Sequence, residues 1–448
     1  MSLPRYPEYK DSGVEWLGEV PGHWYAGRFS RAIEAIKDGT HGTFERVPLG
    51  RPLLSAKNVQ DGYVLVADDE SMVSEADHLS ITANGFPRKG DLLLTIVGTI
   101  GRSCVYEFED PIAFQRSVSF IRLLPGNETK FFYYFTQSKF FQEQLASRSK
   151  SAAQGGVYMG DVVATSIVFP PLPEQTQIAA FLDLETSKID SLVAEQRRLM
   201  ELLKEKRQAV ISHAVTRGLN PDAPLKPSGI EWLGDVPEHW RVGKCGFYLS
   251  ILSGYAFPST GFSTNDSDTR LLRGINVGVA RLKWDEVVYW NRSTDDDLSD
   301  YEMRVGDLVI GMDRPLISEG MRVAKVKDGD LPCLLLQRVA SLKTGPLLNS
   351  DYLLHLLSSE MFVAHFSPDT TGVSVPHISP DQINNFVVPV PPMSEQLEIV
   401  GFIANELAKF DTLTTEAQRA IDLLQERRTA LISAAVTGQI DVRGAVVA

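Results

Sequence analysis

The sequence predicts a mixed α/β chain of the α+β type, built from two similar halves. Each half is a globular domain followed by one long helix. Three observations predict this. A proline-rich segment opens a long helical pattern twice, at Pro170–Gln175 and at Pro391–Gln396. A tryptophan-containing block also occurs twice. Short β-branched runs bounded by Gly, Pro and Asp lie between these features and are typical of strands.

The first long helix is predicted to start after Pro173 and to run to about Thr216. The prolines deny the backbone its donors and hold it extended, so a helix can start just after them. Apolar residues then recur at steps of three, four and seven, and no Gly or Pro interrupts the pattern until Gly218. About forty residues at ~1.5 Å each give a rod of roughly 60 Å.

The second long helix repeats the same register from Pro391–Gln396 to about Thr437. A single amphipathic helix of this length cannot bury its apolar stripe alone, so the two helices are predicted to pack as a coiled coil. The pattern leaves open whether they run parallel or antiparallel. It also fits a purely structural coiled coil or a spacer that sets a distance between domains. The residues predicted to pair the helices or bind a partner are Ile178, Leu182, Ile189, Leu192, Leu199, Leu202, Leu203, Ile399, Phe402, Phe410, Leu413 and Leu424.

The tryptophan block fixes the length of the repeat. Asp11–Trp24 returns as Pro227–Trp240, mostly with identical residues or swaps of Val for Ile and Glu for Asp. The repeating unit is therefore about 220 residues long. Similarity is weaker between the strong blocks, where Lys89–Leu93 resembles Val305–Val309 and Phe114–Arg116 resembles Leu336–Arg338. A repeated scaffold with divergent loops suits two domains of one fold that recognise different things.

Within the first half, residues 1–25 are expected to be loop-like, with Trp16 and Trp24 as anchors. Arg31–Lys37 is compatible with a short helix, and Phe131–Arg148 with an amphipathic helix whose counterpart is Ser350–His365. Strands are predicted at 64–67, 92–97, 103–107, 117–124 and 166–169. The predicted segments are a first domain (1–169), a helical spacer (170–217), a second domain (218–390), a second spacer (391–440) and a tail (441–448).

Composition narrows the class of protein. With 448 residues, 43% of them hydrophobic, the chain can bury more than one core. No apolar run reaches membrane length and the N-terminus lacks the pattern of a signal peptide, so we expect a cytoplasmic protein. Three cysteines, far apart, predict neither disulfides nor a zinc site, and each is expected to be a small core residue. The net charge of −13 argues mildly against a protein that binds nucleic acid alone.

The sequence contains none of the catalytic motifs that were sought. There is no Asn/Asp-Pro-Pro-aromatic motif of amino-group methyltransferases, no phosphate-binding loop and no paired histidine ligands. His23 and His239 stand inside the tryptophan blocks, where packing or hydrogen bonding is the simpler role. We therefore expect no catalytic residue, no metal and no cofactor on this chain.

Polar loop residues of the kind that contact DNA remain. Arg pairs with guanine and Asn or Gln with adenine, while Lys, Ser and Thr suit phosphates. Any one of them could equally be an ordinary surface side chain. The candidates in the first half are Lys57, Asn58, Arg88, Lys89, Thr99, Arg102, Gln115, Arg116, Arg148, Lys150, Gln154 and Tyr158. Those in the second half are Arg270, Arg273, Asn276, Arg314, Gln337, Arg338, Thr371 and His377.

The order of domain, proline-rich helix, domain and proline-rich helix, with the repeated tryptophan block, resembles HsdS, the specificity subunit of type I restriction–modification systems. The resemblance covers essentially the whole chain. It implies a non-catalytic subunit in which each globular domain reads one half of a bipartite sequence in double-stranded DNA. The helices would set the gap and, as the resemblance favours, run antiparallel. They would dock methyltransferase subunits, which carry S-adenosylmethionine, and through them motor nuclease subunits.

Two other functions stay open at this point. The acidic charge favours a non-catalytic scaffold with two protein-binding domains on a coiled coil, and only a steep salt dependence of duplex binding would tell a DNA-binding protein from it. An enzyme with an unrecognised active site would show turnover by the isolated chain. The DNA target itself does not follow from the sequence, because base readout depends on loop geometry and DNA shape.

Overall fold

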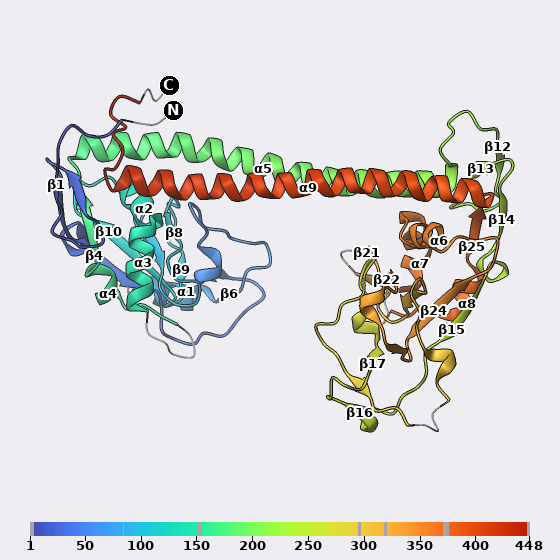
Figure 1. Cartoon of the computed structure of the whole chain (residues 1–448). Coiled ribbons are helices and arrows are strands. Elements are labelled where there is room, and N and C mark those ends of the chain that lie inside the picture. The colour runs from blue at the N-terminus through green and yellow to red at the C-terminus, as the bar shows by residue number, and fades with distance from the viewer. Residues whose placement is uncertain are drawn as a thin grey trace. The chain divides into compact units, whose positions relative to one another are not determined.

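The structure is a computed structural model that describes residues 4–83, 85–149, 155–293, 297–317, 320–370 and 376–445. The chain divides into two compact units, one of residues 1–197 with 418–448 and the other of residues 198–417. Each unit holds one globular domain and a part of each long helix, α5 (Leu172–Arg217) and α9 (Met393–Val436) (Figure 1). None of the helices in the described ranges has the length and apolar character needed to span a membrane.

The first unit is built around a four-stranded antiparallel sheet in the order β4 (Ile33–Asp38), β10 (Val118–Leu123), β7 (Leu92–Thr95) and β8 (Ser103–Val105). A smaller sheet has the order β6, β5, β9. The remaining strands pair as β1 with β2 and as β3 with β11. Their bounds are β1 (Tyr9–Asp11), β2 (Glu19–Pro21), β3 (Tyr25–Arg28), β5 (Arg51–Leu54), β6 (Met72–Val73), β9 (Ala113–Phe114) and β11 (Ser166–Phe169).

The short α-helices in the described part of this domain are α1 (Glu75–Ala83), α2 (Thr129–Gln137), α3 (Lys139–Arg148) and α4 (Met159–Val163). Phenylalanines dominate the core. Phe29, Phe132 and Phe141 are buried, with the Phe29 and Phe132 rings stacked at 5.7 Å between centroids. This core continues into the beginning of α5 and the end of α9, so the domain and the helix ends form one hydrophobic cluster.

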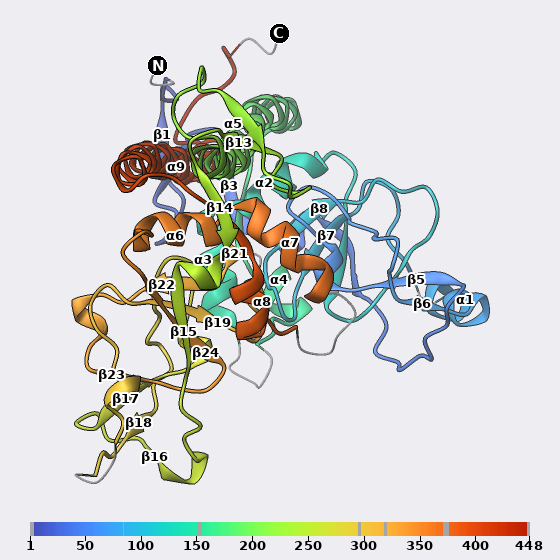
Figure 2. The same ribbon diagram turned by 90° about the vertical axis from the view of Figure 1, so that its right-hand side faces the viewer.

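The second unit repeats this plan. Its four-stranded antiparallel sheet has the order β15 (Leu249–Ser253), β24 (Val339–Thr344), β19 (Leu308–Gly311) and β22 (Val323–Lys325). Figure 2 labels these four strands below α6. The other strands are β12 (Leu225–Pro227), β13 (Asp235–Pro237), β14 (Arg241–Lys244), β16 (Phe262–Ser263), β17 (Thr269–Leu272), β18 (Tyr289–Trp290), β20 (Leu316–Ile317), β21 (Gly320–Met321), β23 (Cys333–Leu335) and β25 (Val387–Val390). Its helices are α6 (Ser350–Leu357), α7 (Glu360–Thr370) and α8 (Pro380–Asn385).

The long helices run antiparallel within each unit. In the first unit, the Asp190 carboxylate of α5 accepts a hydrogen bond from Arg428 Nε of α9 at 3.0 Å. In the second, Arg207 of α5 forms an ion pair with Asp411 of α9. The two aspartates occupy equivalent positions of the repeat, as do the two arginines, so the same contact is made twice. The prediction of two long paired helices is confirmed, with the antiparallel direction that the resemblance favoured.

The predicted seam is correct in part. Ile178, Leu182, Ile189, Leu203, Ile399 and Phe410 are buried, and Leu424 is half-buried. The prediction that the other residues pair the helices was wrong, because their side chains are exposed. These residues are Leu192, Leu199, Leu202, Phe402 and Leu413. The buried positions are instead Val193, Ala417 and Ile421. A two-helix seam covers one narrow stripe, so only one of two adjacent apolar residues can face the partner helix.

Most predicted strands of the first domain are confirmed, but four local predictions were wrong. Arg31–Lys37 belongs largely to β4, because pairing with β10 outweighs local helix propensity. Residues 64–67 hold only a single bridge, between Val59 and Val64. The long helix predicted from Phe131 is split at Ser138, which caps α3 by accepting a hydrogen bond from the Phe141 amide. Trp16 is 61% exposed, whereas Trp24 and the three cysteines are buried as expected.

Candidate nucleic-acid interface

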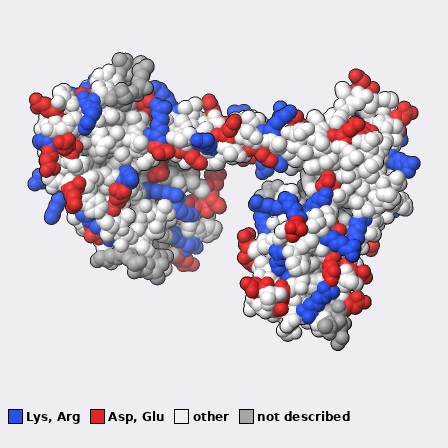
Figure 3. Space-filling model, viewed as in Figure 1, with Lys and Arg blue, Asp and Glu red and all other residues white. Residues whose placement is uncertain are grey.

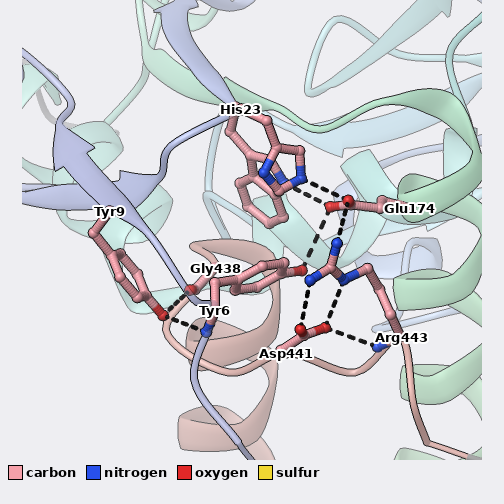
Figure 4. Close-up of polar contacts among 8 residues, drawn as sticks. Tyr6, Tyr9, His23, Glu174, Gly438, Asp441 and Arg443 are labelled. Carbon is pink, nitrogen blue, oxygen red and sulfur yellow. Dashed lines mark hydrogen bonds and ion pairs between the residues drawn. The ribbon is translucent and has the colours of Figure 1, made fainter.

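The two repeated sequence motifs meet each other in the structure. Glu174, from the proline-rich segment, accepts hydrogen bonds from Trp24 Nε1 at 2.6 Å and faces His23 Nε2 at 2.6 Å. Glu174 and Trp24 are both buried. Figure 4 shows Glu174 beside His23, Tyr6 and Arg443. The tryptophan block therefore anchors its domain to the first turn of α5, which explains why both motifs recur.

The second unit makes the same anchor. Glu395 accepts from Trp240 Nε1 at 3.0 Å and faces His239 Nε2 at 2.7 Å. The prediction that His23 and His239 serve hydrogen bonding is thereby confirmed. The glutamine that follows each glutamate also joins helix and domain. Gln175 Oε1 accepts a hydrogen bond from the Glu128 amide at 2.9 Å, and Gln396 Oε1 accepts one from the Asn349 amide at 2.7 Å. These amides stand immediately before α2 and α6.

The first anchor carries an additional staple from the C-terminal tail. The Arg443 guanidinium forms two hydrogen bonds with the Asp441 carboxylate, reaches Glu174 at 3.5 Å and stacks over the Tyr6 ring (Figure 4). The hydrogen bonds from Arg443 hold the pKa of Asp441 below its usual range. Burial, reinforced by the charge of Glu174, raises the pKa of Tyr6. All these residues join helix and domain, which gives the proline-rich motifs a structural role.

The strongest candidate surface is a hollow of about 710 Å³ in the second domain. Among the described residues, five cationic side chains and one carboxylate line this hollow: Arg273, Lys283, Arg314, Arg322, Arg338 and Asp313. Gln337 and the exposed Ile275 lie on its wall. Figure 3 shows Lys and Arg side chains gathered on the lower lobe of the second domain. Four of the eight residues predicted in this half line the hollow together, namely Arg273, Arg314, Gln337 and Arg338.

Two of these arginines have an unusual backbone. Arg314 has φ of 44° and Arg338 has φ of 69°, in the left-handed region that side chains other than glycine rarely adopt. Ala280 is the third such non-glycine residue among those described. This conformation costs on the order of 1–3 kcal/mol per residue and persists where surrounding contacts enforce it. Here the Arg314 amide donates to Pro376 O at 2.7 Å and Arg338 O accepts from the Met312 amide at 2.9 Å.

Asp313 organises the floor of the hollow. Its carboxylate forms an ion pair with Arg338 and a 2.7 Å hydrogen bond with His377 Nδ1, so His377 joins the same group. Partial burial works to raise the pKa of Asp313, but the hydrogen bonds from Arg338 and His377 outweigh it and bring the pKa below its usual value. The carboxylate is therefore ionised at neutral pH.

Arg322 supports the wall from inside. Its Nε donates to Val277 O at 2.9 Å and its Nη1 to Asp313 O at 3.1 Å, which fixes two loops of the hollow. Burial lowers the pKa of this guanidinium. Arg273 donates through Nη2 to Glu286 O at 3.0 Å. Its Nε is buried and has no hydrogen-bond partner among the described residues. A buried donor of this kind is a place where a ligand could bind.

The first domain presents equivalent loops with different residues. The Gln115 amide donates to Leu54 O at 2.8 Å and the Arg116 amide to Thr40 O at 3.0 Å, so both residues follow the end of β9. Arg102 O accepts from the Thr95 amide at 2.9 Å, as Arg322 O accepts from Gly311. Arg116 and Thr99 are exposed, and Arg102 is half-buried. Lys57 forms an ion pair with Glu70 at 2.9 Å.

Several predicted contacts do not belong to these surfaces. Asn58 and Asn276 are 2% and 1% exposed, so the prediction that they contact DNA was wrong. Each amide instead binds the backbone of its own loop: Asn58 Nδ2 donates to Leu65 O at 3.0 Å and Asn276 Nδ2 to Lys283 O at 2.9 Å. A buried amide must satisfy its own hydrogen bonds, and here the loop itself does so.

Four further candidates are placed elsewhere or already engaged. Arg88 and Lys89 precede β7, at the end opposite to Thr99, and Lys89 pairs with Glu109 at 2.5 Å. Arg148 donates to Gln144 O at 3.3 Å. Arg270 donates to Leu331 O at 2.6 Å and stacks on Trp284. Tyr158 is 64% exposed. Lys150, Gln154 and Thr371 lie outside the described residues.

Sequence reasoning missed Asp313, Arg322, Lys283 and Ile275. The repeat held a signal for one of them, because Arg322 occupies the position of Arg102, which was a candidate in the first half. The described residues contain no group of histidine, cysteine and carboxylate side chains that could hold a metal ion.

The chain is similar in sequence to several specificity subunits of type I restriction enzymes. The family model of the type I restriction modification DNA specificity domain matches residues 60–198. The chain is 25% identical over 432 residues to the type I restriction enzyme MjaVIII specificity subunit of Methanocaldococcus jannaschii, covering 95% of this chain and 94% of that protein. It is 34% identical over 203 residues to the EcoAI specificity subunit of Escherichia coli, covering 45% of this chain and 34% of that protein.

Solved structures share the fold. One, from work on complex assembly and conformational transition of the type I restriction–modification system, matches with a TM-score of 0.69 at 17% identity, covering 95% of this chain and 99% of that one. The HsdS subunit from Thermoanaerobacter tengcongensis matches with a TM-score of 0.51 at 18% identity, covering 94% and 98%. The predicted arrangement of two globular domains and two long helices is the fold of these structures.

Proposed function

We propose, from the premise that this chain belongs to the specificity subunits of type I restriction–modification systems, that each globular domain reads one half of a bipartite DNA sequence. The subunit recognises DNA sequence, and catalysis lies in its partner subunits. Residues 1–169 would read one half-site and residues 218–390 the other.

The observation that carries this proposal is the cationic hollow of the second domain. Arginine side chains on rigid loops can donate to guanine O6 and N7 in the major groove, and glutamine can pair with adenine. Arg314, Gln337 and Arg338 are placed on one such surface. The corresponding loops of the first domain carry different polar residues, namely Thr99, Arg102, Gln115 and Arg116. This difference supports the proposal that the first domain recognises a different DNA sequence.

The acidic net charge of −13 is compatible with this proposal. A net charge averages over all faces of a molecule, whereas DNA contacts only one. The described residues that line the hollow carry five cations and one carboxylate, so their summed charge is positive. Partner subunits that enclose the same DNA would neutralise further phosphates.

The exposed leucines of the long helices suit partner binding. Leu192 and Leu413 are equivalent in the repeat and are 46% and 44% exposed, and Leu202 and Leu423 are 51% and 56% exposed. Repeated exposed leucines on a helix pair are typical of an interaction surface. We assign them to methyltransferase subunits, which would carry S-adenosylmethionine and in turn hold the motor nuclease subunits. Such an assembly would act on cellular DNA, and we therefore assign the subunit to the cytoplasm.

The long helices would also set the gap between the half-sites. Helix α5 has 46 residues and spans about 70 Å. Removing one heptad from both α5 and α9 keeps the apolar register and should shorten the methylated motif's gap. A gap of unchanged length in a complex that still methylates would rule out the spacer role.

The direct test is co-expression with the methyltransferase subunit of the same operon, followed by mapping of methylated adenines across the host genome. We expect one bipartite motif with a fixed gap. An assembled complex that binds cofactor, yet methylates no such motif, would contradict the proposal. Duplex binding without salt dependence would then favour the scaffold function, because release of counterions accompanies binding to nucleic acid.

A further inference from the structure

We infer that Asp313 is a specificity-determining residue that competes with DNA for Arg338 and His377, so that only a matching base sequence displaces it. The inference rests on the proposed function and deepens it. It gives a role in selectivity to the one acidic side chain among the described residues that line this cationic surface.

The geometry places Asp313 directly in the path of a ligand. It follows β19 and its backbone forms an isolated bridge with His377. Its carboxylate is 22% exposed and opens into the hollow, where it engages the Arg338 guanidinium and His377 Nδ1. Arg338 and His377 are themselves 65% and 46% exposed, so both can also be reached by a molecule that enters the hollow.

The charge of Asp313 makes the hollow selective. Any DNA that docks there must either leave the Asp313–Arg338 pair in place or replace it. A phosphate brought close to the carboxylate is repelled, and a mismatched base cannot replace both acceptor oxygens. Guanine offers two acceptors, O6 and N7, in the geometry that a guanidinium requires. Asp313 therefore weakens binding to unrelated DNA more than to the cognate half-site.

Backbone hydrogen bonds hold the segments that carry Asp313 and His377 next to each other. Ile378 donates its amide to Met312 O at 2.9 Å, and Arg314 donates its amide to Pro376 O at 2.7 Å. These bonds join the segment of Asp313 to that of His377 on both sides. Arg338 is held at a left-handed φ beside them. Backbone hydrogen bonds thus support the meeting of the three side chains.

The first domain offers an internal comparison. The bridge equivalent to Asp313–His377 joins Val97 and Gly156. Neither residue is ionisable, so the first domain lacks this competitor. Asp313 should consequently affect one half of the recognised sequence and leave the other half unchanged.

The test uses the complex of the full chain with its methyltransferase subunit. Asp313→Asn keeps the shape but removes the charge and leaves one acceptor oxygen, so the side chain can accept from Arg338 or from His377 but no longer from both. We expect its affinity for a duplex of random sequence to rise about ten-fold, which is the effect of one base mismatch. Methylated adenines should then show a relaxed half-site on one side of the gap only.

Two further variants make the result decisive. Glu302→Gln removes the carboxylate of another exposed arginine pair in this domain, with Arg292, and should leave both affinity and motif unchanged. In an Arg338→Ala background, Asp313→Asn should have a smaller effect than in the wild type, because competition for Arg338 is gone and only the contact with His377 and the repulsion of phosphate remain. Failure of the wild-type complex to methylate any bipartite motif would overturn the proposed function itself. A normal wild-type motif would instead overturn this inference if Asp313→Asn matched Glu302→Gln, or if both half-sites relaxed equally.

Discussion

The two globular domains share an anchor and differ in the surface that would read DNA. Glu174 and Glu395 bind the His-Trp pair of their own domains with nearly the same distances. By contrast, the bridge that joins Val97 and Gly156 in one domain joins Asp313 and His377 in the other. The backbone contact is kept while the residues change from Val and Gly to Asp and His. The frame and the recognition residues can thus vary independently.

The anchors themselves are not identical in strength. The Glu174 carboxylate is 11% exposed and is stapled by Arg443, whereas that of Glu395 is 23% exposed. The tail residues Asp441 and Arg443 supply the extra contacts in the first unit. Two kinds of difference therefore separate the halves, one in the anchors and one in the reading loops, and the following variants test them separately.

The largest effect is expected at the helix seam that both halves share. Leu203 is 8% exposed, and its neighbour Leu202 is 51% exposed. Leu203→Asp buries an unpaired charge and should cost about 3–5 kcal/mol of unfolding free energy. Leu202→Asp should change stability by less than about 0.5 kcal/mol, yet weaken binding of the methyltransferase subunit. Denaturant unfolding and co-purification measure both. Equal destabilisation by the two variants would refute the corrected seam.

The next effect concerns the anchors. Glu174→Ala leaves the buried Trp24 indole donor and the Arg443 guanidinium without their acceptor, and should cost about 3 kcal/mol. Glu395→Ala removes the acceptor of Trp240 from the weaker second anchor and should lower the free energy of unfolding by about 1.5 kcal/mol. Thermal and denaturant unfolding of the two variants give this difference. Equal losses would show that the tail staple adds nothing to the first anchor.

A pair of arginine variants tests the reading surfaces. Arg338→Ala should cost about 1–3 kcal/mol in binding of the cognate duplex and relax one half-site. Arg116→Ala should relax the opposite half-site by a comparable amount. Methylation mapping and duplex titrations distinguish the halves. Loss of preference at both half-sites in either variant would contradict independent reading.

The smallest effect is a pH dependence of the tail staple. The folded-state pKa of Asp441 lies below its ordinary value, chiefly because of Arg443. Its contribution is therefore complete above the unfolded pKa of about 3.9 and is lost as pH falls through the lower folded pKa. Asp441→Asn should remove about 1 kcal/mol at neutral pH, a modest amount because Arg443 is partly exposed. The deficit should shrink below pH ~4. A deficit that stays constant as the pH is lowered would argue against the ion pair.

The sequence predicted the frame better than the site, for physical reasons. Helix periodicity and the proline-rich starts depend on local rules, so α5 and α9 were found within a few residues. Seam positions depend on which neighbour a helix meets, so Leu202 was misplaced. Asn58 and Asn276 have the chemistry of base readers but cap their own loops, which only tertiary structure reveals. Asp313 carries the wrong charge for a DNA contact, and its importance follows only from its partners.

The account's central claim is that one chain carries two independent readers on a common frame. The most direct test replaces residues 1–169 by the corresponding domain of another specificity subunit and maps the methylated adenines of the resulting complex. We predict that one half of the motif changes to the donor's half-site, while the other half stays as in the wild type. A motif that changes in both halves, or in neither, would contradict the claim.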